Sequence, residues 1–442
     1  MLNQEQYNAS RSTGGINMVI AGAGTGKTTV LLEKIKSILT YEQVHPSTIL
    51  LLTFSRKAAN ELQERLAVVL GEGMFIPAWT FHSFCFSLLN EFSDSFFHCT
   101  GFRRRPSLVT DQMKFDFFSQ FVYPNLRVFK GMPAAVAIEI LHHYTKLDKR
   151  ILKKLEILGI DSIAEEVLSE YGKYKVENNF IEYEEMITMV IDRLQIDPVF
   201  RQKISQRYTY ILVDEFQDTA DNNFELIKLL LPDSGGNLFI VGDDWQSIYG
   251  FRNAKVGYML DIHKYFPDAV IHKLRVNYRS RKEIVTLSSK FISRNRFRSR
   301  KKLVSWKGAG GIVKFFGVNN SSEEREIINT LMSTLYHKGT IAVLARNNAQ
   351  VNHLKKEYEL RRMKSPDFLT MHAAKGLEFD FVIISGVSDL VIPDRLSDLE
   401  EERRLFYVAL TRAKEQLYII VHVNEQGIPA LFGKELGIKK FE

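Results

Sequence analysis

The feature that most constrains this chain is a glycine-rich segment near its start, residues 21–28, with the sequence AGAGTGKT. A short apolar run at residues 17–21 leads into it, and a helical pattern at residues 27–40 follows it. Glycines let backbone N–H groups close around a phosphate, and the first turn of a helix adds the positive end of a dipole. This order of strand, glycine-rich turn and helix predicts a phosphate-binding loop.

Two side chains of this loop have specific expected tasks. Lys27 places a positive charge at the outer phosphates of a nucleotide, and the Thr28 hydroxyl is a ligand for Mg²⁺. Ala21 stands where the strict pattern has glycine, but Gly24 and Gly26 keep the necessary backbone freedom. The residues expected to bind the nucleotide here are Ala21, Gly22, Ala23, Gly24, Thr25, Gly26, Lys27, Thr28 and Thr29.

A pair of carboxylates follows another apolar run, at residues 208–213. Strand ends in parallel sheets point into the crevice where ligands bind. Asp214 is therefore expected to hold Mg²⁺, and Glu215 to polarise the water that attacks the phosphate. A simple GTPase or a kinase could share these parts, so the loop and the carboxylates alone leave the reaction open.

Apolar runs alternate with helical patterns in two parts of the chain. The runs lie at residues 17–21, 48–54, 208–213 and 237–241, and then at 312–316, 340–345, 368–371, 381–385 and 417–421. Such alternation predicts an α/β fold with two doubly wound parallel sheets. Residues 101–205 interrupt the first part with helix-period apolar positions and are expected to form a helical insertion. The expected domains are residues 1–100 with 206–270, the insertion 101–205, and residues 271–442.

The composition excludes several classes of protein. With 45% hydrophobic and 25% charged residues, the chain is in the globular range and is not disordered. Two cysteines exclude a disulfide framework and fit a reducing compartment, so the cytoplasm is the expected location. No run approaches the roughly 18 apolar residues of a membrane span. The first residues lack a signal-peptide pattern, so no membrane association is expected.

The positive charge is concentrated in one segment, residues 271–310. This segment holds thirteen Lys and Arg residues and one acid, Glu283, so it carries +12 while the whole chain carries +7. The other 402 residues therefore sum to −5. The dense run from Arg294 to Lys302 has two interpretations: a solvated helix end and linker, or a strip that contacts phosphates.

Eight ordered blocks of sequence carry a resemblance to a known family. They are LNQEQ at 2–6, TFSRKAA at 53–59, TFHS at 80–83, DEFQD at 214–218, GDDWQSIYGFR at 242–252, NYRS at 277–280, TMHAAKGLEF at 370–379 and EERRLFYVALTRA at 401–413. In this order they resemble the superfamily 1 DNA helicases of the UvrD/Rep/PcrA type, from residue 2 to about residue 420. The resemblance implies two RecA-like domains, ATP with Mg²⁺ as the cofactor, and single-stranded DNA as the track.

The resemblance assigns residues to both ends of the nucleotide. Gln6 and Tyr278 are expected at the adenine, one as an amide at the base edge and the other as a stacking ring. Gly376 and Glu378 are also expected at the nucleotide, with Glu378 at its ribose.

At the γ-phosphate, the resemblance implies a sensor and two arginine fingers. Gln246 is similar to the family's sensor, and Arg279 and Arg412 are similar to its fingers. An arginine finger typically raises the rate by about 10³–10⁵. The expected catalytic residues are Lys27, Asp214, Glu215, Gln246, Arg279 and Arg412.

Seven residues are expected along single-stranded DNA on the strength of the same resemblance. Aromatic rings can stack on bases at about 1–3 kcal/mol each without reading the sequence. Phe251 stands where many relatives have Trp, so a ring is retained. The seven residues are Phe54, His82, Tyr249, Phe251, Arg252, Thr370 and His372.

The chain departs from the large relatives in two ways. Only 89 residues separate Ser280 from Thr370, about enough for the second sheet alone. The second helical subdomain of those relatives is therefore expected to be absent, a compact pattern that resembles the helicase IV branch. Thr29 stands where many relatives have Arg, which removes one expected nucleotide contact.

The expected function is an ATP-dependent DNA helicase or translocase that acts on single-stranded and tailed duplex DNA. The family implies movement from 3′ to 5′. One alternative is a DNA-stimulated ATPase that unwinds only with a protein partner, in a repair or phage-defence complex. Another, a non-enzymatic binding module, is opposed by the intact ATP residues. The residues leave RNA open as a track, and an isolated monomer is expected.

Overall fold

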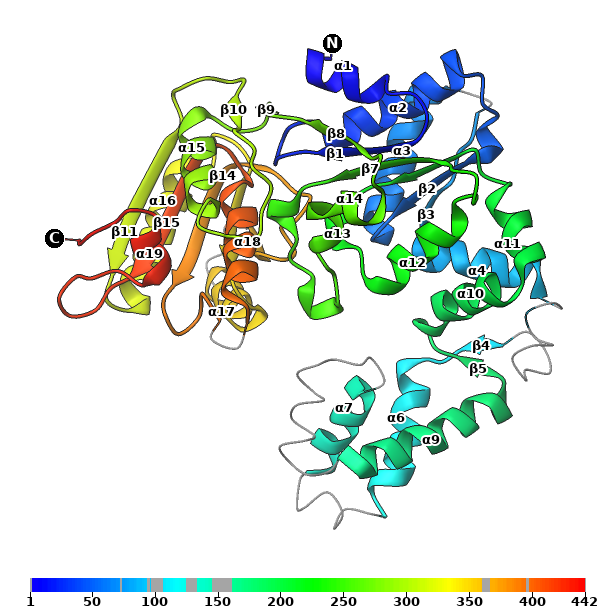
Figure 1. Ribbon diagram of the computed structural model, residues 1–442. Coiled ribbons are helices and arrows are strands. Elements are labelled where there is room, and N and C mark those ends of the chain that lie inside the picture. The colour runs from blue at the N-terminus through cyan, green and yellow to red at the C-terminus, as the bar shows by residue number, and fades with distance from the viewer. Residues whose placement is uncertain are drawn as a thin grey trace.

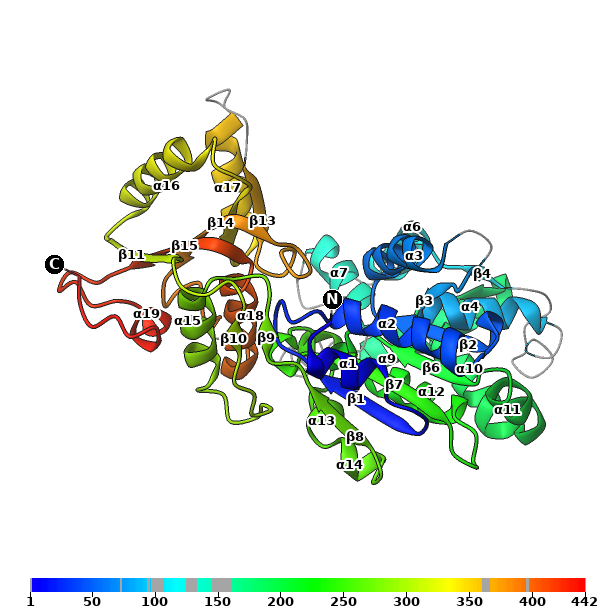
Figure 2. The same cartoon turned by 90° about the horizontal axis from the view of Figure 1, so that it is seen from above.

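The structure is a computed structural model that describes residues 2–71, 74–93, 96, 106–124, 133–144, 161–359, 366–394 and 397–441. Two parallel sheets lie beside each other, the first built mainly by the N-terminal part of the chain and the second by the C-terminal part (Figure 1). Seen from above, the chain passes between them near β9 (Val276–Asn277) (Figure 2). Across the described residues, no helix combines the length and the apolar character needed to cross a membrane.

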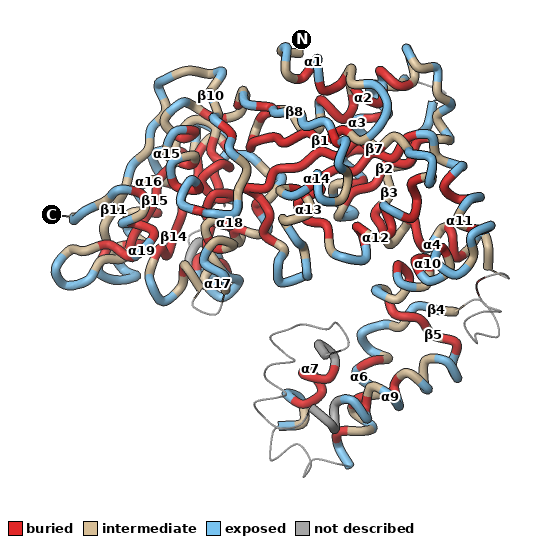
Figure 3. Tube along the Cα trace, viewed as in Figure 1, coloured by how far each residue is buried: buried red, intermediate tan, exposed pale blue. Residues whose placement is uncertain are grey.

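The first sheet has six strands, all paired in parallel, in the order β3-β2-β6-β7-β1-β8. These strands are β1 (Ile16–Ile20), β2 (Ile49–Thr53), β3 (Ala78–Thr80), β6 (Tyr210–Val213), β7 (Asn237–Gly242) and β8 (Val270–Lys273). One face packs on α1 (Gln4–Ser10), α2 (Lys27–Tyr41) and α3 (Arg56–Leu70), and the other on α4 (Phe81–Glu91), α10 (Glu185–Ile196), α11 (Pro198–Ser205) and α12 (Asp221–Leu230). Both faces are covered, so the central strands are largely buried (Figure 3) and mostly apolar, with Asn17 as a buried polar exception.

The second sheet has five parallel strands in the order β11-β15-β14-β12-β13. They are β11 (Ile312–Val318), β12 (Ile341–Ala345), β13 (Asp367–Thr370), β14 (Phe379–Val387) and β15 (Ala413–His422). One face packs on α15 (Lys282–Ile292), α18 (Leu399–Leu410) and α19 (Leu431–Glu435). The other packs on α16 (Ser321–Leu335) and α17 (Asn348–Glu359).

The expected α/β fold with two parallel sheets is confirmed, and each of the nine predicted apolar runs overlaps a strand. The sequence patterns miss β3 and β8, the two edge strands of the first sheet. Edge strands are partly exposed, and in β8 the exposed fraction is 53% for Val270 and 36% for Ile271. Since β8 pairs with β1, the first sheet continues past residue 270, where we expected it to end.

A small helical module is attached to the domain that contains the first sheet (Figure 1). It consists of α6 (Asp111–Val122), α7 (Ala134–Tyr144) and α9 (Asp161–Asn178), which share an apolar core of their own. Two short paired strands, β4 (Ser107–Leu108) and β5 (Phe180–Ile181), connect it to the rest. The predicted insertion of residues 101–205 extends too far, because α10 and α11 pack into the core of the first sheet. Helical periodicity does not reveal which core a helix will join.

Candidate nucleotide site and nucleic-acid interface

The glycine-rich loop connects β1 to α2 in the predicted order. Gly24 and Gly26 have φ angles of 67° and 85°, and Gly26 is the N-cap residue immediately before α2. A Cβ at Gly24 would lie 2.6 Å from the Cβ of Arg279, and one at Gly26 would lie 2.6 Å from Nε2 of Gln6. Both the backbone conformation and the close approach of these neighbours therefore require glycine.

Residues distant in sequence hold this loop in shape. The Asn277 side chain donates to the Ala23 carbonyl at 2.7 Å, and the Tyr278 backbone N–H donates to the Gly24 carbonyl at 2.8 Å. Gln6 donates to the Thr25 carbonyl at 3.0 Å. The two residues expected at the adenine, Gln6 and Tyr278, thus both hydrogen-bond to the loop. Thr29, the next residue after Thr28, is exposed at the start of α2.

Lys27 and Glu215 form an ion pair at the base of the loop, with Nζ and Oε1 3.1 Å apart. Burial alone would raise the pKa of Glu215, but Lys27 and Lys375 outweigh burial and lower it to about 2. Burial would lower the pKa of Lys27, and the nearby carboxylates of Glu215, Asp243 and Asp214 raise it instead. These pKa shifts hold both Lys27 and Glu215 in their charged forms. Glu215 also adopts a left-handed backbone conformation with φ 50°, a conformation uncommon for residues other than glycine.

Asp214 differs from its neighbour Glu215 in its hydrogen bonding and its pKa. Its Oδ1 atom is buried and has no hydrogen-bond partner. Burial and the charge of Glu215 raise the pKa of Asp214 to about 7. An unsatisfied buried carboxylate oxygen is unfavourable unless a ligand supplies a positive charge.

The residues present fit a Mg²⁺ ion. Mg²⁺ is usually held by one or two protein groups together with phosphate oxygens and waters. Thr28 lies in the first turn of α2, beside the phosphate loop, and Oδ1 of Asp214 has no hydrogen-bond partner. Within the described ranges, no three His, Cys, Asp or Glu side chains form a self-contained metal site. Thr28 and Asp214 thus suit a metal that arrives with a nucleotide.

The second half of the chain supplies two arginines to the site. Nη2 of Arg412 donates to Oε1 of Gln246 at 3.1 Å, across the boundary between the sheets. Burial and the adjacent Arg279 lower the pKa of Arg412 to about 9. Arg279 donates to Glu378 at 2.8 Å, so Glu378 currently pairs with an arginine. These contacts, together with the Lys27–Glu215 pair, bring the predicted catalytic side chains close to one another.

Gly376 lies in the turn between β13 and β14, where its φ angle is 86°. No atom lies within 4 Å of the position that a Cβ would take. Its conformation, and not a steric restriction, is what favours glycine there.

Three polar residues of the site lie within the recognised blocks but were not singled out from the sequence. Lys375 pairs with Asp218 and also donates to the Gln246 carbonyl at 3.1 Å. Burial raises the pKa of Asp218 to about 6. Gln217 donates to Glu215 and accepts from the Asp243 backbone N–H at 2.8 Å. The blocks mark these positions, but only the fold shows which side chains meet.

Aromatic side chains from both sheets gather in one cluster. The rings of Phe54 and Tyr249 stack at 5.3 Å, and the rings of Phe251 and His372 lie 5.8 Å apart. The Arg252 guanidinium lies 5.6 Å from the Tyr249 ring and 5.5 Å from the Phe251 ring. Phe251 remains 41% exposed. Five of the seven residues predicted along DNA are thus adjacent, and we call them the aromatic cluster.

The other two predicted DNA residues have different surroundings. The His82 ring stacks on Tyr183 at 4.0 Å instead of on the cluster, and burial with the charge of Arg56 lowers its pKa to about 4. Thr370 accepts a hydrogen bond from the Ala373 backbone N–H at 3.1 Å, which shapes the turn that carries His372. Burial, followed by Arg346, lowers the pKa of His372 to about 4.

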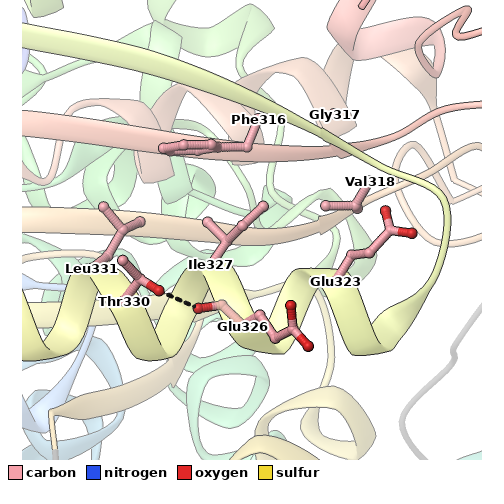
Figure 4. A pocket seen from close by; sticks show the side chains of 8 residues that line it. All are labelled: Phe316, Gly317, Val318, Glu323, Glu326, Ile327, Thr330 and Leu331. Carbon is pink, nitrogen blue, oxygen red and sulfur yellow. Dashed lines mark hydrogen bonds between the residues drawn. The ribbon is translucent and has the colours of Figure 1, made fainter.

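A cavity of about 380 Å³ lies elsewhere, at the edge of the second sheet between β11 and α16 (Figure 4). None of the residues predicted at the nucleotide or the DNA lines it. It is lined by Phe316, Gly317, Val318, Glu323, Glu326, Ile327, Thr330 and Leu331.

Comparison with known proteins agrees with this geometry. Residues 2–267 match the UvrD/REP helicase N-terminal domain, and residues 272–365 and 360–424 match the UvrD-like helicase C-terminal domain. A probable DNA helicase of Mycoplasma pneumoniae is 29% identical over 95% of this chain and 83% of its own length. The ATP-dependent DNA helicase PcrA of Bacillus subtilis is 30% identical over 79% of this chain and 48% of its own length.

A third relative is the DNA helicase II of Rickettsia typhi, which is 29% identical over 81% of this chain and 55% of its own length. The chain therefore spans about half the length of most of these curated relatives. Their names agree with the expected enzyme class, an ATP-dependent DNA helicase. With both domain matches covering most of its length, the chain belongs to the UvrD/REP family of DNA helicases.

Proposed function

We propose that this protein binds ATP between its two sheets and hydrolyses it to move along single-stranded DNA. The observation that carries the proposal is the contact between Gln246 and Arg412 beside the Lys27–Glu215 pair. It joins the half of the chain that carries the phosphate-binding loop to Arg412 in the other half. An ATPase whose two halves meet at the γ-phosphate can convert closure of its cleft into motion.

Lys27 and Glu215 exchange partners in the proposed reaction. In the absence of nucleotide they neutralise each other. Phosphate oxygens would draw Lys27 away, and Glu215, which stays ionised because of its low pKa, would then orient and polarise the attacking water. Mg²⁺, held by Thr28 and Asp214, would neutralise charge on the phosphates.

Arg279 and Arg412 would stabilise the charge that develops during phosphoryl transfer. Both are supplied by the second half of the chain, so the reaction depends on the two sheets coming together. Hydrolysis would weaken that contact again, because the negative charge that holds the arginines leaves with the products. The proposed cycle therefore opens and closes the cleft once per ATP.

The aromatic cluster is the proposed contact with single-stranded DNA. In the free protein its rings contact one another, and bases would replace those contacts at about 1–3 kcal/mol each. Lys375 connects the cluster to the ATP site, since its Nζ lies 4.8 Å from the Tyr249 ring and 3.1 Å from the Gln246 carbonyl. This link supports coupling between ATP and the strand. Movement from 3′ to 5′ is proposed from the family resemblance alone.

For the basic segment, residues 271–310, we favour the interpretation that it includes a strip that contacts phosphates. Several of its cations are paired, for example Arg275 with Glu5 and Arg281 with Glu415. By contrast, the cations at 294, 296, 300 and 302 are exposed, and no ion pair involves them in the described part of the chain. Glu400 accepts from the Arg296 backbone N–H at 2.6 Å and so fixes the loop that presents them. We propose that this loop contacts the DNA backbone.

A second candidate is a translocase that separates strands only with a partner. One observation favours it: α17 ends at Glu359 and β13 begins at Asp367, so a second helical subdomain has no room there. A partner from a repair or defence complex would then supply the element that splits the duplex. We propose a monomer in the cytoplasm in both cases.

The decisive experiment measures ATP hydrolysis with and without single-stranded DNA, and then strand displacement from duplexes with 3′ or 5′ tails. Strong stimulation with unwinding from the 3′ tail alone supports an autonomous helicase. Stimulation without unwinding supports the second candidate. The variant Lys27→Ala should lose hydrolysis and keep DNA binding, whereas full hydrolysis by this variant would contradict the assigned site.

A further inference from the structure

A lysine outside the recognised blocks is buried in the wall of the ATP cleft. The side chain of Lys301 is 0% exposed, as are those of Asp243 and Asp244. Its Nζ donates to Oδ1 of Asp243 at 2.5 Å, to Oδ1 of Asp244 at 2.9 Å and to the Ala21 carbonyl at 2.6 Å. An ammonium group has three donors, so all of them are used.

The partners of Lys301 lead directly to the proposed reacting groups. Ala21 begins the phosphate loop. The other oxygen of Asp243 accepts from Nε2 of Gln246 at 2.5 Å, and Gln246 in turn accepts from Arg412 at 3.1 Å. Lys301 therefore contacts the loop on one side and the carboxylate that orients the γ-phosphate sensor on the other.

The loop that carries Lys301 is fixed against the first sheet. The Ser299 backbone N–H and hydroxyl both donate to Asp244 at 2.6 Å. The indole N–H of Trp245 donates to the Ser299 carbonyl at 3.2 Å. Because this loop follows α15, it brings a cation from the second half of the chain into the first. A rigid attachment of this kind is what a positioning side chain needs.

We propose that Lys301 is a positioning residue for ATP hydrolysis, which sets Gln246, through Asp243, relative to the phosphate loop. The inference rests on the proposed function. It goes beyond charge neutralisation, because an ion pair that only stabilises the fold would not need to act through Gln246. Lys301 does not touch the nucleotide itself in this proposal.

The effect is expected on turnover more than on nucleotide affinity. Replacing Lys301 by Met leaves Oδ1 of Asp243 with the Trp245 backbone N–H as its remaining donor, so the carboxylate that accepts from Gln246 is held less firmly. A misplacement of about 1 Å in a reacting group lowers a rate by about 10²-fold. The groups beside the adenine, Gln6 and Tyr278, do not contact Lys301, so the KM for ATP should change by less than about threefold.

The test compares four proteins by steady-state ATP hydrolysis with single-stranded DNA and by thermal unfolding. Lys301→Met is the main variant, and Lys338→Met is its matched control, because Lys338 has the same charge, is exposed and lies outside the proposed nucleotide and DNA contacts. The double variant Lys301→Met/Asp244→Asn keeps the net charge of the buried cluster, so it preserves folding if the single variant unfolds. Wild-type protein is the reference.

The expected result is a loss of about 10²-fold in kcat for both variants that lack Lys301, and wild-type kcat for Lys338→Met. A cycle with Gln246→Ala tests the route: once Gln246 is absent, Lys301→Met should lower kcat by less than about twofold. Wild-type kcat in the folded double variant, or effects of Lys301→Met and Gln246→Ala that multiply in full, would overturn the inference. A wild-type protein without ATP hydrolysis would overturn the proposed function as well.

Discussion

Each sheet buries a carboxylate near the carboxyl ends of its strands, but the two carboxylates differ in their hydrogen bonding. In the second sheet, Glu324 accepts from the Ser385 hydroxyl at 2.8 Å and the Gly386 N–H at 2.6 Å, and lies 3.1 Å from His422. In the first sheet, Asp214 keeps one buried oxygen without a partner. The same architecture thus produces a closed structural network in one place and an open acceptor in the other.

The pKa values follow the same contrast. Burial would raise the pKa of Glu324, but its hydrogen bonds from His422 and Ser385 lower it. Burial raises the pKa of Asp214 to about 7, since no donor opposes the effect at Oδ1. The difference therefore lies in hydrogen bonding and not in the type of sheet: protein donors satisfy Glu324, whereas Asp214 keeps an acceptor available for a ligand.

The largest expected difference between the two sheets is in catalysis. Glu215→Gln removes the proposed general base and should lower DNA-stimulated ATP hydrolysis by about 10²–10⁴-fold. Glu324→Gln is the matched control, because it makes the same chemical change to a buried carboxylate of the other sheet. It should leave turnover within about twofold of wild type in protein that remains folded. Equal losses in both variants would remove the contrast.

The same control variant should show its effect in stability. Glu324→Gln replaces an acceptor with an amide that cannot satisfy both donors, and should lower the free energy of unfolding by about 1–3 kcal/mol. Glu326→Gln, on the exposed face of the same helix, should change it by less than about 0.5 kcal/mol. Urea unfolding of the two variants measures the difference. If they unfold alike, Glu324 is not a structural group.

Asp214→Asn should raise the free energy of unfolding near neutral pH, whereas Glu324→Gln should lower it. The raised pKa means that the folded protein binds a proton on Asp214 more tightly than the unfolded chain does. Wild-type stability should therefore fall as the pH rises from about 4 to about 7 in the absence of Mg²⁺, by about 1–3 kcal/mol. The variant should lack this dependence and also lose Mg²⁺-dependent hydrolysis. A wild-type profile in the variant would show that Asp214 is already satisfied.

The smallest expected effect concerns His82, which is partly buried and stacks on Tyr183. Its pKa of about 4 is below the ordinary 6.5, so the neutral ring is the folded form. Its contribution to stability is present above about pH 6.5 and is lost as the pH falls through about 4, by about 1 kcal/mol. His82→Gln should flatten this part of the unfolding profile. A shift between pH 7 and 8 would contradict the assignment.

The sequence predicted most of the fold because central strands in parallel sheets form continuous apolar runs. It missed β8, whose exposed residues form no such run, and it assigned α10 and α11 to the wrong core. For the site, block residues such as Lys27 and Glu215 were predictable because their chemistry depends on local spacing. Lys301 was not, because its partners lie up to 280 residues away.

This separation along the chain has a consequence for how the protein is made. The Ala23 carbonyl cannot accept its hydrogen bond until Asn277 has been synthesised, 254 residues later. The Ala21 carbonyl likewise has no bond from Lys301 until that residue has been added. At about 5–20 residues per second, the ribosome needs on the order of ten to fifty seconds to supply them. During that interval the loop is exposed in a nascent chain without its later partners. The ATP site thus matures after its first residues have long left the ribosome.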